Sequence, residues 1–311
     1  MPAAGTPPSP APRRVITRRG VLRAGLIVSG ASGLVLSGTA AWAGAEAAYE
    51  LVVTRYALRP PRWPTGQRLG ITVLADLHAG GPNMGIARVR QVVDRANSLD
   101  SDLVVILGDY GASHPFVTEV VPHGAWAAEL ARLRAPLGVF AILGNHDWWS
   151  DIAGIRRALL RERMPLLEND VVPLRFAGGR IWLAGLGDQL SFRLGDGRYR
   201  GTDDLPGTLD RIQGDEPAVL LAHEPEVFSR VPDRVALTLA GHTHGGQVRL
   251  PGVSPCWIDA CHSGRYVYGS VFRLKSYRSC SAPDAAFSRG NLLTFRRHRG
   301  APKRRQEKCD L

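Results

Sequence analysis

Two histidines separated by one residue stand in the segment GHTHGGQ, residues 241–247. His242 and His244 follow an apolar run, and residues i and i+2 of an extended chain point to the same side. Neutral imidazole is the commonest protein ligand of metal ions. The pair therefore predicts a site that both rings face, although ordinary surface or core histidines would explain the pair alone equally well.

Polar residues of the same kind end four further apolar runs, each of them typical of a buried strand. These runs occupy residues 68–80, 102–111, 137–149 and 217–228. Asp76, His78, Asp109, Asn145, His146 and His223 lie at or just past their ends. Apolar residues at helical spacing fill 85–99, 124–135 and 150–164, and this alternation predicts parallel βαβ units. Open α/β sheets bind ligands at the carboxyl ends of their strands, so one site is expected there.

The second half of the chain predicts further elements around that site. Two short runs, VVPLRFAG and RIWLAGLGD, indicate a hairpin around Gly178 and Gly179. The glycine-rich and charged segment 193–207 is expected to be a surface loop. Ser150 is the expected cap of the helix in 150–164.

Five short motifs then follow one another in a characteristic order: DLH, GD, GNHD, AHEP and GHTHGGQ. In this order they resemble the signature of the calcineurin-like metallophosphoesterase superfamily, over about residues 68 to 252. The resemblance implies an α/β fold, a four-layer α/β/β/α sandwich with two mixed sheets. Paired arginines near the start and the GHTHGGQ form resemble the exported branch of bacterial phosphodiesterases.

The resemblance also implies two divalent metal ions, and mixed nitrogen and oxygen ligands suit Mn, Fe or Zn. Asp76, His78 and His244 would hold the first ion, Asn145, His223 and His242 the second, and Asp109 would bridge them. Two such ions roughly 3.5–4 Å apart neutralise a phosphodiester and lower the pKa of a shared water. The bridging hydroxide would then attack phosphorus.

Two residues of GNHD have expected roles besides ligation. His146 matches the family histidine that binds or protonates the leaving-group side, and protonation is general acid work suited to imidazole. Asp147 either orients a ligand or provides a charge at the start of a helix. Trp148 and Trp149 follow and either contact substrate or pack in the protein.

The segment GDYGASH lacks the Asp and Arg that many phosphoprotein phosphatases carry after Gly-Asp, which argues against a protein-phosphatase role.

The amino end is expected to be an export signal, residues 1–45. Arg18 and Arg19 precede an uncharged, mildly apolar run at 24–45, as in a twin-arginine signal. AWA at 41–43 would permit cleavage, and an uncut membrane anchor is the competing interpretation. The expected location is the periplasm or the outer face of the cytoplasmic membrane.

The formal charge of +11 is concentrated in the two ends of the chain. Residues 24–270 carry 23 basic and 25 acidic residues. A nucleic-acid domain carries its basic patch on the folded surface, so no nucleic-acid partner is expected. The metallophosphoesterase domain is expected at 46–270. Residues 271–311 form an atypical basic tail, for which disorder and an altered reading frame are both open.

Four cysteines, at 256, 261, 280 and 309, form no CxxC pair, and three disulfide pairings are open.

The expected function is two-metal hydrolysis of phosphodiester or pyrophosphate bonds. A small phosphodiester or a lipid-linked or nucleotide-sugar substrate of the cell envelope, of the UDP-diacylglucosamine type, is expected. The twin-arginine machinery would be a partner, with membrane association open. The alternative is a non-catalytic metal-binding protein of the envelope.

Overall fold

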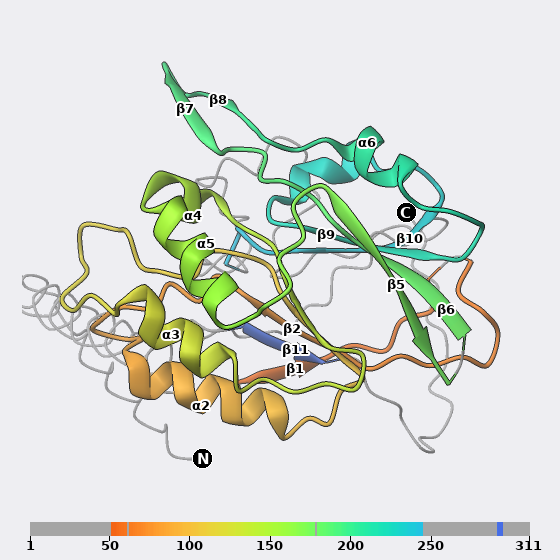
Figure 1. Cartoon of the computed structure of the whole chain (residues 1–311), viewed down its shortest axis with the longest axis horizontal. Coiled ribbons are helices and arrows are strands. Elements are labelled where there is room, and N and C mark those ends of the chain that lie inside the picture. The colour runs from red at the N-terminus through yellow and green to blue at the C-terminus, as the bar shows by residue number, and fades with distance from the viewer. Residues whose placement is uncertain (1–50, 61, 178, 245–290, 295–311) are drawn as a thin grey trace, which may run out of the picture. The chain divides into compact units, whose positions relative to one another are not determined.

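The computed structural model describes residues 51–60, 62–177, 179–244 and 291–294. All of them belong to one compact unit, residues 48–311 (Figure 1). The expected export signal, the four cysteines and most of the expected basic tail lie outside the described residues. None of the helices in the described part combines the length and apolarity that a membrane crossing requires.

The first sheet has five strands and carries the predicted βαβ units. In spatial order its strands are β1 (Val53–Arg55), β11 (Asn291–Thr294), β2 (Ile71–Ala75), β3 (Leu103–Ile106) and β4 (Val139–Ala141). Strands β2, β3 and β4 are parallel. Helices α2 (Ile86–Asn97) and α3 (His123–Leu130) connect them. The carboxyl ends of these three strands therefore share one edge.

The second sheet has four strands in the order β10 (Val235–Ala240), β9 (Ala218–Ala222), β6 (Gly179–Gly185) and β5 (Asp170–Phe176). Strands β10, β9 and β6 are parallel, and β5 pairs antiparallel with β6. The hairpin predicted around Gly178 and Gly179 is confirmed by this last pairing.

Three apolar cores separate the layers and confirm the sandwich. Strand side chains alternate between faces, so Leu103 and Val105 of β3 pack against the second sheet. Val104 and Ile106 pack against the helices instead. A third core lies under α6 (Leu205–Asp210) and the 3₁₀ helix η1 (Pro225–Ser229), on the outer face of the second sheet. The layers are thus helices, sheet, sheet and helices.

Two local expectations are wrong. Helix α5 (Ile152–Arg161) is capped by Asp151, whose carboxylate accepts a hydrogen bond from the Gly154 N–H at 2.9 Å, and not by Ser150. The expected loop at 193–207 instead contains the antiparallel hairpin of β7 (Phe192–Gly195) and β8 (Arg198–Arg200) and the start of α6. Asp196 and Gly197 both have positive φ, as a tight hairpin turn requires.

Strand β11 shows that part of the expected tail belongs to the first sheet. It pairs in parallel with β1 and antiparallel with β2, and so lies between them. The expectation of a tail outside the fold therefore does not hold for residues 291–294, which include most of the strand-like NLLTF.

We predict that deleting residues 271–311 destabilises the protein, because β1 and β2 lose the strand between them. Each lost backbone hydrogen bond is worth about 1 kcal/mol net, so the free energy of unfolding should fall by several kcal/mol. Urea denaturation measures it. The matched control deletes only 295–311, which retains β11. Equal midpoints for the two truncations would contradict the prediction.

Candidate metal centre

The carboxyl ends of five strands meet at one place, as predicted. Strands β2, β3 and β4 contribute from the first sheet, and β9 and β10 from the second. Contacts link all eight predicted side chains: Asp76, His78, Asp109, Asn145, His146, His223, His242 and His244. The site is therefore built from segments that are far apart in the sequence.

The backbone at these strand ends adopts a rare conformation. Asp76, His78, Asp109, His242 and His244 all have positive φ, between 42° and 67°. The i and i+2 argument for the two histidines of GHTH is therefore wrong, because neither residue is extended. Left-handed backbone in residues other than glycine is held by surrounding structure and gathers at functional sites. Here it turns each side chain off its strand toward the site.

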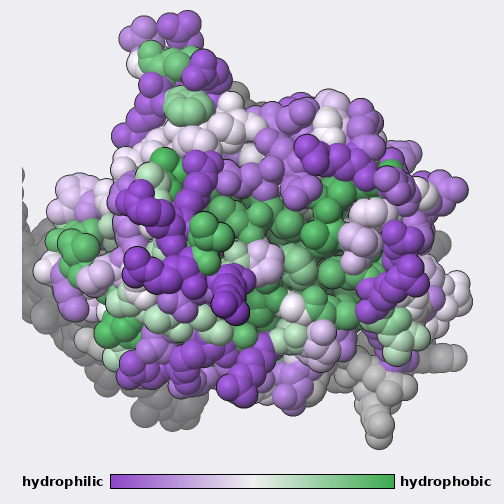
Figure 2. Space-filling view, in the orientation of Figure 1, coloured by the Kyte–Doolittle hydropathy of each residue, from purple (hydrophilic) through white to green (hydrophobic). Residues whose placement is uncertain are grey.

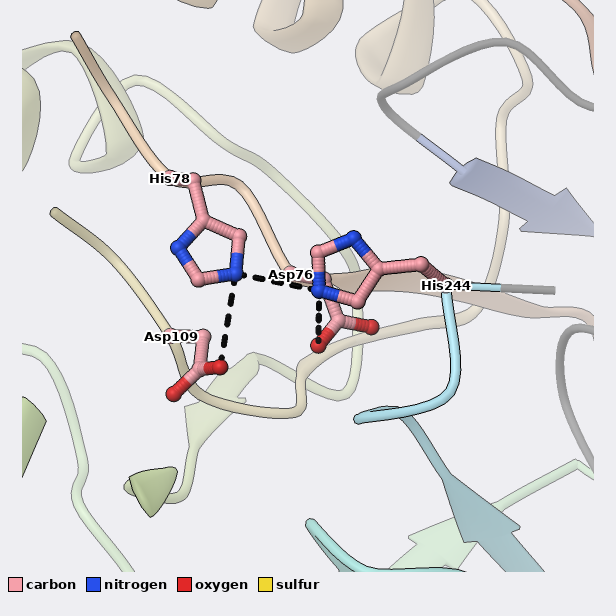
Figure 3. Close-up of side chains that lie close together, drawn as sticks. All are labelled: Asp76, His78, Asp109 and His244. Carbon is pink, nitrogen blue, oxygen red and sulfur yellow. Dashed lines mark hydrogen bonds and ion pairs between the residues drawn. The ribbon is translucent and has the colours of Figure 1, made fainter. Parts of the chain in front are cut away.

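One group of four side chains forms the first candidate ion site (Figure 3). Ligand atoms of Asp76, His78, Asp109 and His244 all lie within 4.8 Å of one another. His78 Nε2 is 3.1 Å from His244 Nε2 and 3.4 Å from Asp109 Oδ2. His244 Nε2 is 3.6 Å from Asp76 Oδ1. Two carboxylates and two imidazoles are a donor set suited to a transition metal ion.

A second group surrounds the Asn145 side chain. Its Oδ1 lies 3.0 Å from His223 Nε2 and 3.0 Å from His242 Nδ1. His242 and His244 thus belong to different groups. Asp109 Oδ2 is 3.3 Å from His223 Nε2, so the Asp109 carboxylate lies between the two groups.

The orientation of His223 fits a cation in front of it. Its Nδ1 donates to the Leu107 carbonyl at 2.6 Å, an arrangement that metal-bound histidines use. Its Nε2 then faces the oxygens of Asn145 and Asp109. A nitrogen lone pair facing two oxygens is repulsive unless a proton or a metal ion lies between them. Asp109 Oδ2 is itself buried without a hydrogen bond in the described structure, which fits the same requirement.

Burial and charge set the protonation of these imidazoles. Burial lowers the pKa of His78 to about 4 and that of His242 to about 4, so both rings are neutral near pH 7, as metal binding requires. Burial also opposes protonation of His223, but the charge of Asp109 raises its pKa well above the usual value. In the metal-free protein the His223 imidazolium therefore supplies the positive charge that buried Asp109 needs.

Asp147 fixes the backbone around Asp109. Its buried carboxylate accepts hydrogen bonds from the N–H groups of Asp109 and Tyr110, both at 2.9 Å, and of Gly144 at 2.8 Å. Burial, and then the charge of Asp109, raise the pKa of Asp147 to about 7. Both roles expected for Asp147 fit the structure, because it holds the backbone of Asp109 and also lies in the first turn of α4 (Asn145–Trp149), where it accepts the N–H of the N-cap residue Gly144.

Two glycines of the motifs let these segments approach. Gly108, at φ +91°, faces Gly144 so closely that a Cβ would overlap its backbone. A Cβ on Gly144 would overlap the Asp109 carboxylate and the His223 ring. The glycines of GD and GNHD are therefore required for the ends of β3 and β4 to reach β9.

His146 lies beside the first group. It belongs to the short helix α4 (Asn145–Trp149), and its ring is 5.0 Å from that of His78. The Ser113 hydroxyl lies 2.6 Å from His146 Nδ1 and orients the ring. Burial lowers the pKa of His146, and Asp109 opposes that effect. A lowered pKa makes the protonated ring a stronger acid.

Sequence reasoning missed Ser113, Asp188 and Glu224. Ser113 stands within GDYGASH, and Glu224 follows His223 directly. Their closeness in the sequence to predicted site residues was the signal that could have identified them. A Glu224 carboxylate oxygen lies within 4.8 Å of ligand atoms of His223 and His242. Burial, and then the charge of Asp188, raise the pKa of Glu224 well above its usual value. By its position, Glu224 is a further candidate metal ligand beside the second group.

The two tryptophans after GNHD have different surroundings. Trp148 is half-buried and packs against the helix-side core. The Trp149 ring lies 5.2 Å from the His146 ring, and its Nε1–H donates to the Leu190 carbonyl at 2.9 Å. Trp148 fits the packing role, and Trp149 lies beside the site.

Comparison with known proteins decides the family. A family model described as calcineurin-like phosphoesterase matches residues 69–246. The chain belongs to the calcineurin-like phosphoesterase family. Members of this family use a dinuclear centre of divalent metal ions, and the two groups around Asp109 provide donors for one.

Relatives with this phosphoesterase domain come from distant organisms. A bovine "Transmembrane protein with metallophosphoesterase domain" is 31% identical over 215 residues, 65% of this chain and 46% of the relative. An "Uncharacterized metallophosphoesterase" of Aquifex aeolicus is 29% identical over 204 residues, 66% of this chain and 74% of the relative. The chain thus spans less than half the length of the bovine relative. A 5'-nucleotidase precursor of Thermus thermophilus aligns with TM-score 0.39 and 16% identity, over 57% of this chain and 42% of that one.

A surface hollow elsewhere on the protein is not at the expected place for a ligand site. It has a volume of about 650 Å³ and is lined by residues that include Asn97, Ser101, Arg132 and Pro136. Ser101 and Pro136 precede β3 and β4, so the hollow lies at the amino ends of the strands. Ligands of open α/β sheets bind at the opposite ends.

We predict that Asp147→Asn weakens metal binding while the fold persists. The amide would turn an N–H group toward a backbone N–H and release the segment that holds Asp109. Loss of such a supporting partner typically lowers metal affinity about 10–100-fold. Competition with a fluorescent chelator measures the affinity. Asp151→Asn, at an exposed helix cap, is the control, and equal affinities for both variants would refute the prediction.

Proposed function

We propose that the protein hydrolyses phosphodiester or pyrophosphate bonds at a centre of two divalent metal ions. The observation that carries this proposal is the Asp109 carboxylate, which lies between two groups of metal-ligand side chains. His223 Nε2 and His78 Nε2 lie 3.3 Å and 3.4 Å from its Oδ2. A carboxylate so placed can serve two ions at once, and the family to which the chain belongs supports the activity.

The residues divide into two holding sets and one proton donor. We propose that Asp76, His78 and His244 hold one ion, Asn145, His223 and His242 the other, and Asp109 both. Two bound ions would neutralise the phosphate oxygens and lower the pKa of a water. Ser113 holds His146 by Nδ1, which leaves Nε2 to donate a proton to the departing oxygen.

A non-catalytic metal-binding protein is the second candidate. His146 is not needed for holding metal, since its Nδ1 contacts Ser113 and its ring lies beside the first group. A pure binder would have no use for an imidazole oriented in this way. The catalytic interpretation therefore accounts for one more residue than the alternative does.

We further propose that the substrate belongs to the cell envelope and that the chain reaches it by twin-arginine export. Arg18 and Arg19 before a mildly apolar run support export. A lipid-linked or nucleotide-sugar substrate would suit that location. The periplasm or the outer face of the cytoplasmic membrane is the proposed location, with Mn, Fe or Zn as the metal.

We expect Asp109→Asn to lose bound metal and nearly all turnover, because a neutral amide cannot compensate two cations. Plasma emission spectroscopy of the purified protein gives the metal content. Bis(p-nitrophenyl) phosphate in the presence of Mn²⁺ gives the activity. Asp94→Asn, on the exposed face of α2, is the control and should behave as the wild type. Two equivalents of metal and full turnover in Asp109→Asn would end the two-metal proposal.

We expect His146→Ala to retain its metal and turn over slowly. General acid catalysis contributes ~10²–10⁴-fold, and the loss should be largest for poor leaving groups that need the proton. The measurement compares kcat for phosphodiesters that share one ester group and differ in the leaving group, which is p-nitrophenol in one and an alkyl alcohol in the other. An equal loss for every leaving group would show that His146 has another role.

A further inference from the structure

The hairpin of β7 and β8 is not explained by the two-sheet core. It forms a separate two-stranded sheet, and all of residues 192–200 are exposed. Figure 1 shows it projecting beside α4, and Figure 2 shows apolar surface among hydrophilic side chains along it. Three of the six large apolar side chains that are exposed in the described chain, Phe192, Leu194 and Tyr199, belong to it. An exposed element of this kind calls for a role outside folding.

One face of the hairpin lies on Trp149. Arg193 and Tyr199 are directly opposite each other across the two strands and so share a face. The Arg193 guanidinium carbon is 3.7 Å from the centre of the Trp149 ring, and the Tyr199 ring stacks on Trp149 at 5.7 Å. Trp149 in turn contacts His146, the proposed proton donor. The hairpin therefore reaches the leaving-group side of the metal centre.

Arg193 is available to an anion. Within the described part of the chain, no hydrogen bond or ion pair joins it to an acidic group, in contrast to Arg156, which pairs with Glu168. Stacking on an aromatic ring holds the guanidinium plane and leaves its N–H groups free at the edge. Those groups match the geometry of a phosphate or carboxylate. A held cation without an acidic partner beside a proton donor is suited to a ligand.

We propose that Arg193, supported by Trp149 and Tyr199, forms a subsite for a second phosphate on the leaving group of the substrate. This inference rests on the proposed function and specifies its substrate as a pyrophosphate-linked diester. Water adds to one phosphorus and gives up one proton to solvent, and the bond from that phosphorus to the bridging oxygen breaks. The bridging oxygen leaves with the second phosphate and takes its proton from His146, which regains one from solvent. Two phosphate monoesters result.

Arg193→Gln, Arg193→Lys and the control Arg198→Gln test the subsite in the full-length, Mn²⁺-loaded protein. Arg198 is also exposed on the same hairpin but does not stack on Trp149. The substrates are bis(p-nitrophenyl) phosphate and the symmetrical bis(p-nitrophenyl) pyrophosphate, which differ by one phosphate. We expect Arg193→Gln to lower kcat/KM about tenfold on the pyrophosphate, as for one charged hydrogen bond. On bis(p-nitrophenyl) phosphate, the same variant should change kcat/KM less than about threefold. Arg193→Lys should recover part of the loss, and Arg198→Gln should match the wild type.

A binding measurement separates the subsite from the activity. By calorimetry, methylenediphosphonate should bind the wild type about tenfold more tightly than Arg193→Gln, as one charged hydrogen bond provides. Methylphosphonate should bind both equally. If the wild type hydrolyses neither ester, the proposed function fails, and this binding difference still supports or overturns the subsite. Equal losses on both esters, equal effects of Arg193→Gln and Arg198→Gln, or equal binding of methylenediphosphonate would overturn it.

Discussion

The burial of the Asp109 carboxylate is the constraint on which the rest of the site depends. Only 1% of this residue is exposed, and an isolated buried carboxylate is very unfavourable. Its Oδ1 accepts the His146 N–H at 2.9 Å, but its Oδ2 has no hydrogen-bond donor in the described structure. A positive charge must therefore stand near Oδ2. The protonated His223 ring provides it without metal, and bound cations would provide it with metal.

That requirement explains why so much of the fold converges on one edge. The ligand groups come from two sheets, and the apolar core between the sheets fixes their separation together with the hydrogen bonds of His223 to Leu107 and of His242 to Asp76. Gly108 and Gly144 remove the side chains that would keep β3 and β4 away from β9. Asp147 then ties the two loops together through three backbone N–H groups. Asp109 is one of five site residues with left-handed backbone, and these contacts hold it in that conformation, which nothing in an isolated strand end would favour.

How much of the fold and of the candidate site could be predicted from the sequence depends on how far apart in the sequence the interacting residues are. Apolar runs with polar residues at their ends predicted β2, β3, β4, β9 and β10 and all the candidate ligands except Glu224, because burial and strand direction are local signals. Ser113 and Glu224 were missed because their partners, among them His146 and Gln189, are distant in the sequence. The β7–β8 hairpin was taken for a loop because its segment is rich in glycine and charged residues and its strands are only four and three residues long. Strand β11 was placed outside the fold because a basic composition outweighed one short apolar run.

Helix α4 contacts both groups of candidate ligands, the backbone of Asp109 and the β7–β8 hairpin within little more than one turn. Successive helical residues are rotated by about 100°, so neighbours in the sequence face different directions. Asn145 accordingly faces the second group of candidate ligands, and Asp147 faces the backbone of Asp109. His146 lies beside the first group, while Trp149 supports the hairpin that carries Arg193. The candidate metal ligands thus rest on the core, whereas the proposed subsite joins Trp149 of α4 to an exposed hairpin, none of whose residues is a member of the three cores. A change of substrate could therefore arise in the hairpin without disturbing the strand ends that hold Asp109.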